Sequence, residues 1–307
     1  MLKEIYKLGE LTIQSNIRNT ERVTHHLRDL FWECTLSCNA KCKHCGSSAE
    51  KRKYEGELTT EEIKSAFKQI ADSMDASKIL INVTGGEPLV RQDLCEVMEY
   101  ASKELGFHWG MTTNGILLNE KNIAKLKNAN MESISVSIDG LQETHDEFRG
   151  VPGSYNIIMN NIKKLKEADF VKHLQVTTVF HKKNINQLQE LYDIMKNLGL
   201  DYEKEVRRQY FYCRTGISVA SILYNGDLFV CPNVPRVSRL IQGNIRTDNF
   251  KEVWDNKYTE FRDKNRMACE ECNKCENWDY CLGGALHTWN FEEKCQNKCP
   301  YKMMKDV

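Results

Sequence analysis

The sequence predicts an α/β protein in which helices surround a parallel β-sheet, followed by a small cysteine-rich C-terminal domain. Two observations support this prediction. Between residue 31 and about residue 198, short β-rich runs alternate with amphipathic stretches of helical periodicity, and this alternation indicates βαβ units. After Leu200 the helical periodicity fades and Gly, Asn, Asp and Cys become frequent. Eight of the 13 cysteines fall within residues 213–307.

Each element of the α/β part has its own residue pattern. The expected strands lie at residues 31–36, 79–84, 108–112, 133–138 and 173–180. The expected helices are apolar on one face only and lie at residues 60–74, 91–105, 120–127, 154–167 and 186–198. Thr59 and Glu62 form a capping-box pattern at the start of the first of these helices. A single apolar face per helix places the helices outside the sheet.

Changes in composition divide the chain into four parts. These are an N-terminal extension at 1–30, the α/β core at 31–200, a short connection at 201–212 and the cysteine-rich tail at 213–307. Within the connection, residues 206–212 are a candidate for a shortened strand. In the tail, Asn225-Gly226-Asp227 separates two apolar runs, 220–224 and 228–231, and Asn-Gly between such runs is typical of a β-hairpin.

Charge and composition exclude several classes of protein. The 307 residues include 43 basic and 43 acidic side chains, and this balance argues against binding of nucleic acid through bulk charge. No apolar run approaches the roughly 18–20 residues of a membrane span, and residues 1–16 do not read as a secretory signal. We therefore expect a cytoplasmic protein with neither a nucleic-acid nor a membrane partner. Thiols stay reduced there, so clustered cysteines indicate metal rather than disulfides.

Three cysteines directly follow the first expected strand. Cys38, Cys42 and Cys45 are spaced C-x3-C-x2-C, so one loop presents three thiolates to a common centre. Three ligands leave a fourth position open, as a site requires if something other than protein must bind the metal. The alternative is a zinc site completed by His44 or by a distant ligand. In parallel α/β barrels, loops at this end of the strands carry the active site.

A second motif ends the second expected strand. It reads Thr84-Gly85-Gly86-Glu87-Pro88, in which two glycines allow a close backbone approach to a ligand and Glu87 adds a carboxylate. Together with the three-cysteine loop, this motif resembles the radical S-adenosylmethionine (SAM) superfamily. The resemblance implies a partial (β/α) TIM-like barrel, shortened at its sixth unit because only residues 201–212 remain for it. It also implies reductive cleavage of SAM to a 5′-deoxyadenosyl radical that abstracts hydrogen from the substrate.

The resemblance also implies the site residues. Cys38, Cys42 and Cys45 would ligate a [4Fe–4S] cluster that binds SAM. The SAM-binding residues would be Thr84, Gly85, Gly86, Glu87, Asn114, Ser137, Asp139 and Arg149. The segments around the last three look like peptide-modifying members, where a serine and a downstream arginine contact the SAM carboxylate.

Some of these residues have simpler alternative roles. Arg149 could form a loop salt bridge with Asp146 or Glu147, and Asn114 and Asp139 could cap turns. On the fifth expected strand, Thr177 and Thr178 could line the adenosine pocket or could serve only as strand residues.

The tail cysteines are similar to those of the SPASM domain, which holds two auxiliary [4Fe–4S] clusters. They are Cys213, Cys231, Cys269, Cys272, Cys275, Cys281, Cys295 and Cys299. The resemblance puts Cys213 and Cys231 in the first auxiliary cluster and Cys272, Cys275 and Cys281, with a late cysteine, in the second. A cysteine of the family pattern is replaced here by Ala285, so the partition of the ligands stays open. A zinc module is the alternative for the tail.

The remaining cysteines and the aromatic residues of the tail have structural interpretations. Cys34 and Cys95 are expected to pack as buried apolar residues, with a hydrogen-donor role for Cys34 near the barrel mouth as the alternative. The tail residues Trp278, Tyr280, His287 and Trp289 are expected to shield the clusters from solvent.

The expected function is radical modification of a peptide or protein, by analogy with enzymes that mature ribosomally made precursor peptides. A short precursor peptide would bind in extended form along a strand edge near the hairpin at 220–231. Flavodoxin or ferredoxin would supply the electron. The alternatives are a small-molecule maturase of the same superfamily and a non-catalytic iron–sulfur or zinc scaffold.

Overall fold

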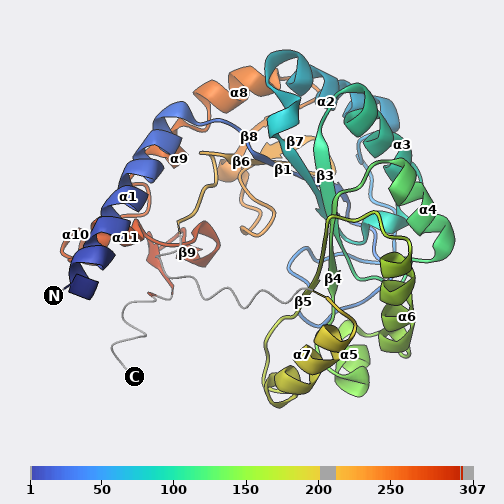
Figure 1. Cartoon of the computed structure of the whole chain (residues 1–307). Coiled ribbons are helices and arrows are strands. Elements are labelled where there is room, and N and C mark those ends of the chain that lie inside the picture. The colour runs from blue at the N-terminus through green and yellow to red at the C-terminus, as the bar shows by residue number, and fades with distance from the viewer. Residues whose placement is uncertain (1, 201–211, 298, 300–307) are drawn as a thin grey trace.

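The computed structural model describes residues 2–200, 212–297 and 299 of the chain. Its centre is a curved eight-stranded sheet in the order β5-β4-β3-β2-β1-β6-β7-β8 (Figure 1). The strands are β1 (Asp29–Thr35), β2 (Leu80–Gly85), β3 (His108–Thr113), β4 (Ser133–Ser137), β5 (His173–Thr177), β6 (Val219–Ile222), β7 (Asp227–Phe229) and β8 (Ile241–Asn244). Strands β1 to β6 pair in parallel, whereas β7 and β8 are antiparallel additions. A separate antiparallel pair consists of β9 (Trp289–Asn290) and β10 (Cys295–Gln296).

The helices follow the strands as βαβ units require. The α-helices are α1 (Leu2–Thr24), α2 (Thr60–Ser73), α3 (Leu94–Glu99), α4 (Glu120–Asn128), α5 (Gln142–Arg149), α6 (Ser154–Glu167), α7 (Leu188–Asn197), α8 (Phe250–Asn256), α9 (Thr259–Arg262), α10 (Glu270–Asn273) and α11 (Trp278–Cys281). Short 3₁₀ turns lie at Ala76–Lys78, Pro88–Val90, Ile185–Gln187, Ser238–Leu240 and Leu286–Thr288, and a π-helical turn at Tyr100–Glu104 extends α3. No helix within the described residues is long and apolar enough to cross a membrane.

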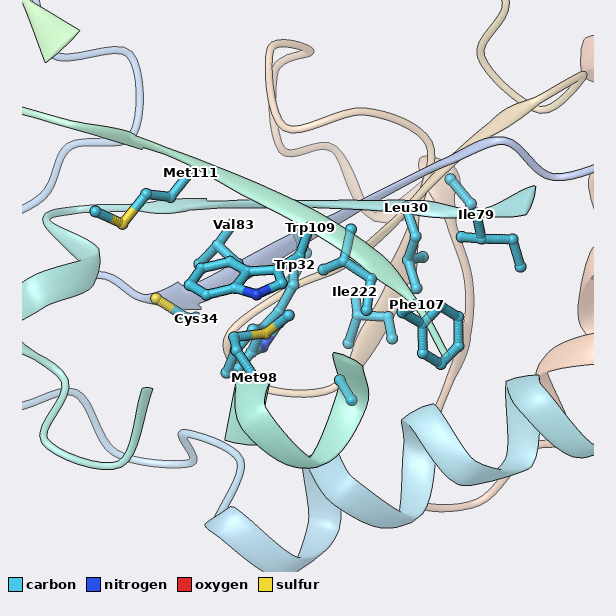
Figure 2. Packing of buried hydrophobic residues seen from close by; sticks show 14 of the residues in the cluster. Leu30, Trp32, Cys34, Ile79, Val83, Met98, Phe107, Trp109, Met111 and Ile222 are labelled. Atoms are coloured by element: carbon cyan, nitrogen blue, oxygen red, sulfur yellow. The ribbon is translucent and has the colours of Figure 1, made fainter. Parts of the chain in front are cut away.

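The side of β1 that faces the helices forms the core. Leu30, Trp32 and Cys34 alternate along β1 and are fully buried, and the ring of Trp32 meets that of Phe67 of α2 edge-on at 5.5 Å. Trp109 of β3 packs beside them (Figure 2), and its indole donates to the Ala129 carbonyl at 2.6 Å. Burial strongly raises the pKa of the Cys34 thiol. Cys34 therefore packs as expected, and the hydrogen-donor alternative is wrong because its thiol points into this core.

The opposite side of the sheet carries polar side chains on β1 and β4, with Phe31 as an apolar residue among them. On β1 this side carries Phe31, Glu33 and Thr35, and in the sheet register Glu33 stands beside Thr84 of β2. On β4 it carries Ser135 and Ser137, which stand beside residues 175 and 177 of β5. An inner face of this kind is suited to a polar ligand, because an apolar interior would leave such a ligand without hydrogen-bond partners.

The expected α/β architecture is confirmed, with one strand shorter than expected and two helices that were not expected. The expected strand at 173–180 ends at Thr177. The capping box at Thr59 and Glu62 is present, but α1 and α5 had no counterpart among the expected elements. The candidate strand at 206–212 lies outside the described residues except for Tyr212.

The tail contributes to the main sheet. The predicted hairpin is present as β6 and β7, and β6 pairs in parallel with β1 on its other side. β7 in turn pairs with β8. Both hairpin strands are thus paired along both edges, so neither of them offers a free edge to a peptide. Among the described strands, the edge nearest to it belongs to β8 (Ile241–Asn244).

The N-terminal helix lies against the tail. Figure 1 shows α1 running beside α11. Arg18 of α1 donates to the carbonyl of Tyr280 in α11, and Glu21 pairs with Arg214 at 3.0 Å. The extension at 1–30 therefore connects the start of the chain to the cysteine-rich end.

Candidate active site and cysteine clusters

The cluster loop, residues 36–54, joins β1 to α2 and carries the first three cysteines. Cys38 is buried, Cys42 is half-buried and Cys45 is exposed. Two backbone amides donate to these sulfurs, Ala40 to Cys38 and Ala49 to Cys45, each at 3.4 Å. Backbone bonds from residues 41 and 43 to the end of α5 hold the loop against the carboxyl ends of the strands.

The donor set of the cluster loop fits an iron–sulfur cluster. Burial raises the pKa of the Cys38 and Cys42 thiols, so a bound metal is needed to keep them as thiolates. Amide N–H groups directed at sulfur are one of the ways in which proteins stabilise such clusters. Within the described residues, no three His, Cys, Asp or Glu side chains converge on a single metal ion.

The two glycines after β2 are required by the cluster loop. A Cβ on Gly85 would lie 2.2 Å from the Thr35 carbonyl oxygen, and one on Gly86 would lie 2.2 Å from that of Ser37. The amide of Gly86 donates to Thr35 at 2.7 Å, and that of Glu87 donates to Ser37 at 2.9 Å. In the structure these glycines allow a close approach to the backbone at the end of β1 and the start of the cluster loop, and their approach to a ligand stays a prediction.

Glu87 connects the ends of β2 and β3. Its carboxylate is fully buried and accepts from the Thr113 hydroxyl and the Asn114 amide, each at 2.7 Å, and from the Leu89 amide at 3.2 Å. Burial raises its pKa, and these three hydrogen bonds oppose that rise. The side chain of Asn114 continues the network to Asn39 of the cluster loop at 2.7 Å. Glu87 and Asn114 thus position the loop.

Asp139 and Arg149 form a buried ion pair beside Cys42. Asp139 follows β4 and is fully buried, and its Oδ2 lies 2.6 Å from Nε of Arg149, whose side chain is 12% exposed. The second carboxylate oxygen of Asp139 accepts from the Val179 amide at 2.8 Å. Nη1 of Arg149 lies 3.7 Å from the Cys42 sulfur. A permanent positive charge is therefore held next to a cluster-loop thiol.

The alternative partners expected for Arg149 are wrong. Asp146 instead caps the start of α6, where it accepts from the Ser154 hydroxyl at 2.9 Å. Glu147 binds Lys43 at 2.6 Å and Lys183 at 2.7 Å on the surface.

The other expected SAM-pocket residues lie on the strand ends around this ion pair. In the sheet register Ser137 stands beside Thr177, and the Thr177 hydroxyl bonds that of Ser135 at 2.5 Å. The Thr178 hydroxyl donates to the Ile138 carbonyl at 2.7 Å. The structure thus brings together the ends of β2, β3, β4 and β5 at one edge, next to the three cysteines.

Three stacked rings extend this site in a way that the sequence did not indicate. His44 stacks on Phe148 with ring centroids 4.4 Å apart, and Phe148 stacks on His181 at 3.9 Å. His44 Nε2 lies 3.7 Å from Asp139. His145 is buried behind it, and its Nδ1 accepts from the Asp139 amide at 3.1 Å, while burial lowers its pKa to about 4.

All thirteen cysteines are free thiols, and those of the tail fall into two groups. In the first group, burial raises the pKa of Cys231, and repulsion from Cys213 adds to this rise. The second group contains the six later cysteines. The sulfurs of Cys269 and Cys272 lie 3.2 Å apart.

Electrostatic coupling links the rest of the second group. Burial raises the pKa of Cys281, and repulsion from Cys299 and Cys275 adds to this rise. Cys269 contributes in the same way to the raised pKa of Cys295. Ala285 carries no ligand atom in its side chain, and its carbonyl accepts from the Thr288 hydroxyl at 2.8 Å. The second group thus places Cys269 beside Cys272 and couples Cys281 to Cys275 and Cys299, so it offers thiol ligands other than a cysteine at position 285.

A cavity of about 840 Å³ separates the cluster loop from the tail. Residues from both parts line it: Leu36, Gly46, Ser47, Ser48, Glu50, Arg52, Tyr54, Tyr224, Pro232, Asn233, Val234, Pro235, Arg236 and His287. No sequence pattern indicated Arg52, Tyr54 or Arg236, since nothing in their local surroundings distinguishes them from ordinary loop residues. His287, which was expected to shield a cluster, lies at this cavity, whereas Trp289 is buried in β9.

Comparison with known proteins agrees with this arrangement. The profile of the family described as the radical SAM superfamily matches residues 32–195, which is more than half of the chain. The profile described as an iron–sulfur cluster-binding domain, SPASM, matches residues 213–276.

Several characterised proteins are similar to this chain. The AdoMet-dependent heme synthase of Methanosarcina barkeri is 28% identical over 85% of this chain and 92% of its own length. That of Oleidesulfovibrio alaskensis is 36% identical over 56% of this chain, which spans only 43% of that relative. The mycofactocin maturase MftC of Mycolicibacterium smegmatis is 26% identical over 84% of this chain and 77% of its own length.

A solved structure shares the fold. The crystal structure of Streptococcus suis SuiB bound to precursor peptide SuiA superposes with a TM-score of 0.67 and 18% sequence identity. The superposition covers 84% of this chain and 72% of SuiB.

Proposed function

Because the chain belongs to the radical SAM superfamily and carries a SPASM domain, we propose that it modifies a peptide or protein substrate by radical chemistry. It is an enzyme whose cofactors are SAM and [4Fe–4S] clusters, which sets aside the scaffold and zinc alternatives. When bound, these cofactors supply a one-electron reduction of SAM and a 5′-deoxyadenosyl radical. The observation that carries the choice of substrate is the cavity of about 840 Å³ between the cluster loop and the tail.

The cluster loop binds the iron–sulfur cluster, and the strand ends bind SAM. Cys38, Cys42 and Cys45 hold the cluster that binds SAM. The SAM molecule binds at the strand ends through residues from the set Thr84, Gly85, Gly86, Glu87, Asn114, Ser137, Asp139 and Arg149. Arg149 is the residue suited to the SAM carboxylate, since a guanidinium binds a carboxylate through two parallel hydrogen bonds. In this role it exchanges part of its contact with Asp139.

The tail cysteines hold the auxiliary clusters. Cys213 and Cys231 belong to the first, and the group from Cys269 to Cys299 supplies the second and completes the first. Arg266 lies next to the buried residue Cys213, because its guanidinium donates to the Cys213 carbonyl at 2.8 Å. A cation in this place suits an anionic cluster ligated by thiolates.

A peptide substrate fits the cavity better than a compact metabolite does. The cavity has one wall from each half of the chain, so an extended segment of a peptide can contact both halves. SuiB, which shares the fold, has been crystallised with a bound precursor peptide, and this supports the same class of substrate. We place the reaction in the cytoplasm, with flavodoxin or ferredoxin as the electron donor.

Heme synthesis is the second candidate, and one observation favours it. The heme synthase of Methanosarcina barkeri aligns with 85% of this chain and 92% of its own length, so its size closely matches that of this enzyme. An iron porphyrin is also within the size that the cavity admits.

One experiment separates the two candidates. The reconstituted enzyme is incubated without oxygen with SAM, a reductant and either a short peptide encoded beside its gene or an iron porphyrin. Mass spectrometry should show a mass change in the peptide together with 5′-deoxyadenosine. Formation of heme from the porphyrin, with the peptide unchanged, would contradict the proposal.

A further inference from the structure

The cavity places its ligand between the two groups of cysteines. One wall is the cluster loop from Gly46 to Tyr54, which directly follows Cys45. The opposite wall is the segment 232–236, which directly follows Cys231. A substrate bound here touches both the loop of the SAM cluster and the segment next to an auxiliary cysteine, so the side chains of these walls determine which substrate group is held there.

The charged lining of the cavity favours an anion. Among the lining residues, Arg52, Arg236 and His287 can carry positive charge, and Glu50 can carry negative charge. Glu50 pairs with Arg52 at 3.0 Å, but the two side chains are 63% and 64% exposed. Exposed pairs of this kind contribute little to stability, so Arg52 can exchange Glu50 for a ligand.

Aromatic rings hold both arginines in fixed planes. The guanidinium of Arg52 lies over the Tyr54 ring at 4.5 Å, and that of Arg236 lies near the Tyr224 ring at 5.9 Å. The two tyrosine rings meet edge-on at 5.9 Å. This row of four side chains lines one continuous part of the cavity. Guanidinium groups held in this way lose little conformational freedom when they bind a ligand.

Arg236 also forms an ion pair with Glu33 of β1. The Glu33 carboxylate is 1% exposed and pairs with Arg236 through Oε2, whereas the Arg236 side chain is 35% exposed. Oε1 of Glu33 is buried and, among the described residues, has no hydrogen-bond partner. The negative charge is therefore hidden beneath the guanidinium. A guanidinium has five N–H donors. Those that Arg236 does not direct at Glu33 are available to a ligand in the cavity.

From this lining we infer that the cavity binds a carboxylate of the substrate, and that Arg236 and Arg52 recognise it. The inference rests on the proposed function, because it specifies the peptide as one with an acidic side chain near the modified residue. A guanidinium binds a carboxylate through bidentate hydrogen bonds. Glu33 is the positioning residue that sets the plane of Arg236.

A peptide selection tests the inference without knowledge of the natural substrate. The SAM-loaded holoenzyme is used to select from a random library of twelve-residue peptides, and bound sequences are compared with the input. We expect Asp and Glu to be enriched about fivefold or more at one position. Arg52→Gln should weaken this enrichment, and Arg52→Gln combined with Arg236→Gln should abolish it.

Matched variants control for folding and for general charge. Lys53→Gln removes a positive charge one residue from Arg52 and outside the cavity lining, so it should leave the enrichment unchanged. Because Arg236→Gln alone leaves Glu33 buried without its partner, Glu33→Gln is added to it. Every variant is checked for iron content and for SAM cleavage without substrate.

The outcomes distinguish this inference from the proposed function. If the enzyme selects peptides without acidic bias, or the bias survives in the arginine variants, the carboxylate role is refuted. A selected peptide that is nevertheless modified would leave the proposed function standing. If no peptide is modified and heme forms from an iron porphyrin, the proposed function fails.

Discussion

Replacement of Asp139 by Asn should destabilise the enzyme by about 3 kcal/mol, because it leaves Arg149 without its buried counter-charge. Asp139 is fully buried and lies 2.6 Å from Arg149, whose side chain is only 12% exposed to solvent. Asn retains the shape of Asp and keeps an oxygen that can accept from the Val179 amide, which donates to Asp139 at 2.8 Å. The substitution therefore removes the charge and places an amide NH2 donor opposite the Nε–H donor of Arg149, and both changes destabilise the pair.

Glu147→Gln is the matched control on the neighbouring helix. Glu147 pairs with Lys43 and Lys183, but its side chain is 49% exposed, and exposed pairs contribute about 0–1 kcal/mol. Both variants are unfolded in urea under anaerobic conditions, and the free energies of unfolding are compared with that of the wild type. Equal losses of stability in the two variants would refute the assignment of a buried ion pair at Asp139.

Three further substitutions test other parts of the site. Gly86→Ala should displace the cluster loop and lower the iron content, since its Cβ would lie 2.2 Å from the Ser37 carbonyl oxygen. A Cβ at Gly46 would have no atom within 4 Å, so Gly46→Ala should keep its iron. Equal iron content in the two variants would contradict this. Burial lowers the pKa of His145 to about 4, against about 6.5 in the unfolded chain. The folded state therefore loses stability as the pH falls from about 6.5 towards 4, and the loss reaches up to about 3 kcal/mol. His145→Gln should flatten this part of a plot of unfolding free energy against pH, and an unchanged slope would argue against it. Cys275→Ala should lower the iron content and abolish substrate modification while some 5′-deoxyadenosine is still formed; complete loss of SAM cleavage in a folded variant would mean that the tail cluster supplies electrons to the first site.

Much of the α/β core was predictable because its signals are local. Periodicity marked the strands β1 to β5, and the capping box at Thr59 is present. The N-terminal helix was missed because its contacts, such as Arg18 with Tyr280, join residues that are distant in sequence. The pairing of β6 with β1 was missed for the same reason. No periodic pattern reports which strand lies beside which.

The candidate site was predictable as motifs but not as contacts. The spacing of the three cysteines predicted the cluster loop, and two glycines predicted the end of β2. Their fit against the backbone carbonyls of Thr35 and Ser37 was not predictable, because these contacts join segments that are distant in sequence. The ion pair of Arg149 with Asp139 spans ten residues and depends on how α5 packs against β4. The cavity depends on the meeting of two remote segments, which sequence patterns do not encode.

The central claim is that the cluster loop holds an iron–sulfur cluster that cleaves SAM, and one measurement tests it most directly. Wild-type protein and a variant with Cys38, Cys42 and Cys45 changed to Ala are reconstituted without oxygen and incubated with SAM and dithionite. Three [4Fe–4S] clusters would give about 12 iron atoms per chain. The variant should lose about four of these and form no 5′-deoxyadenosine. Undiminished 5′-deoxyadenosine from the variant, or stoichiometric zinc without iron in the wild type, would contradict the claim.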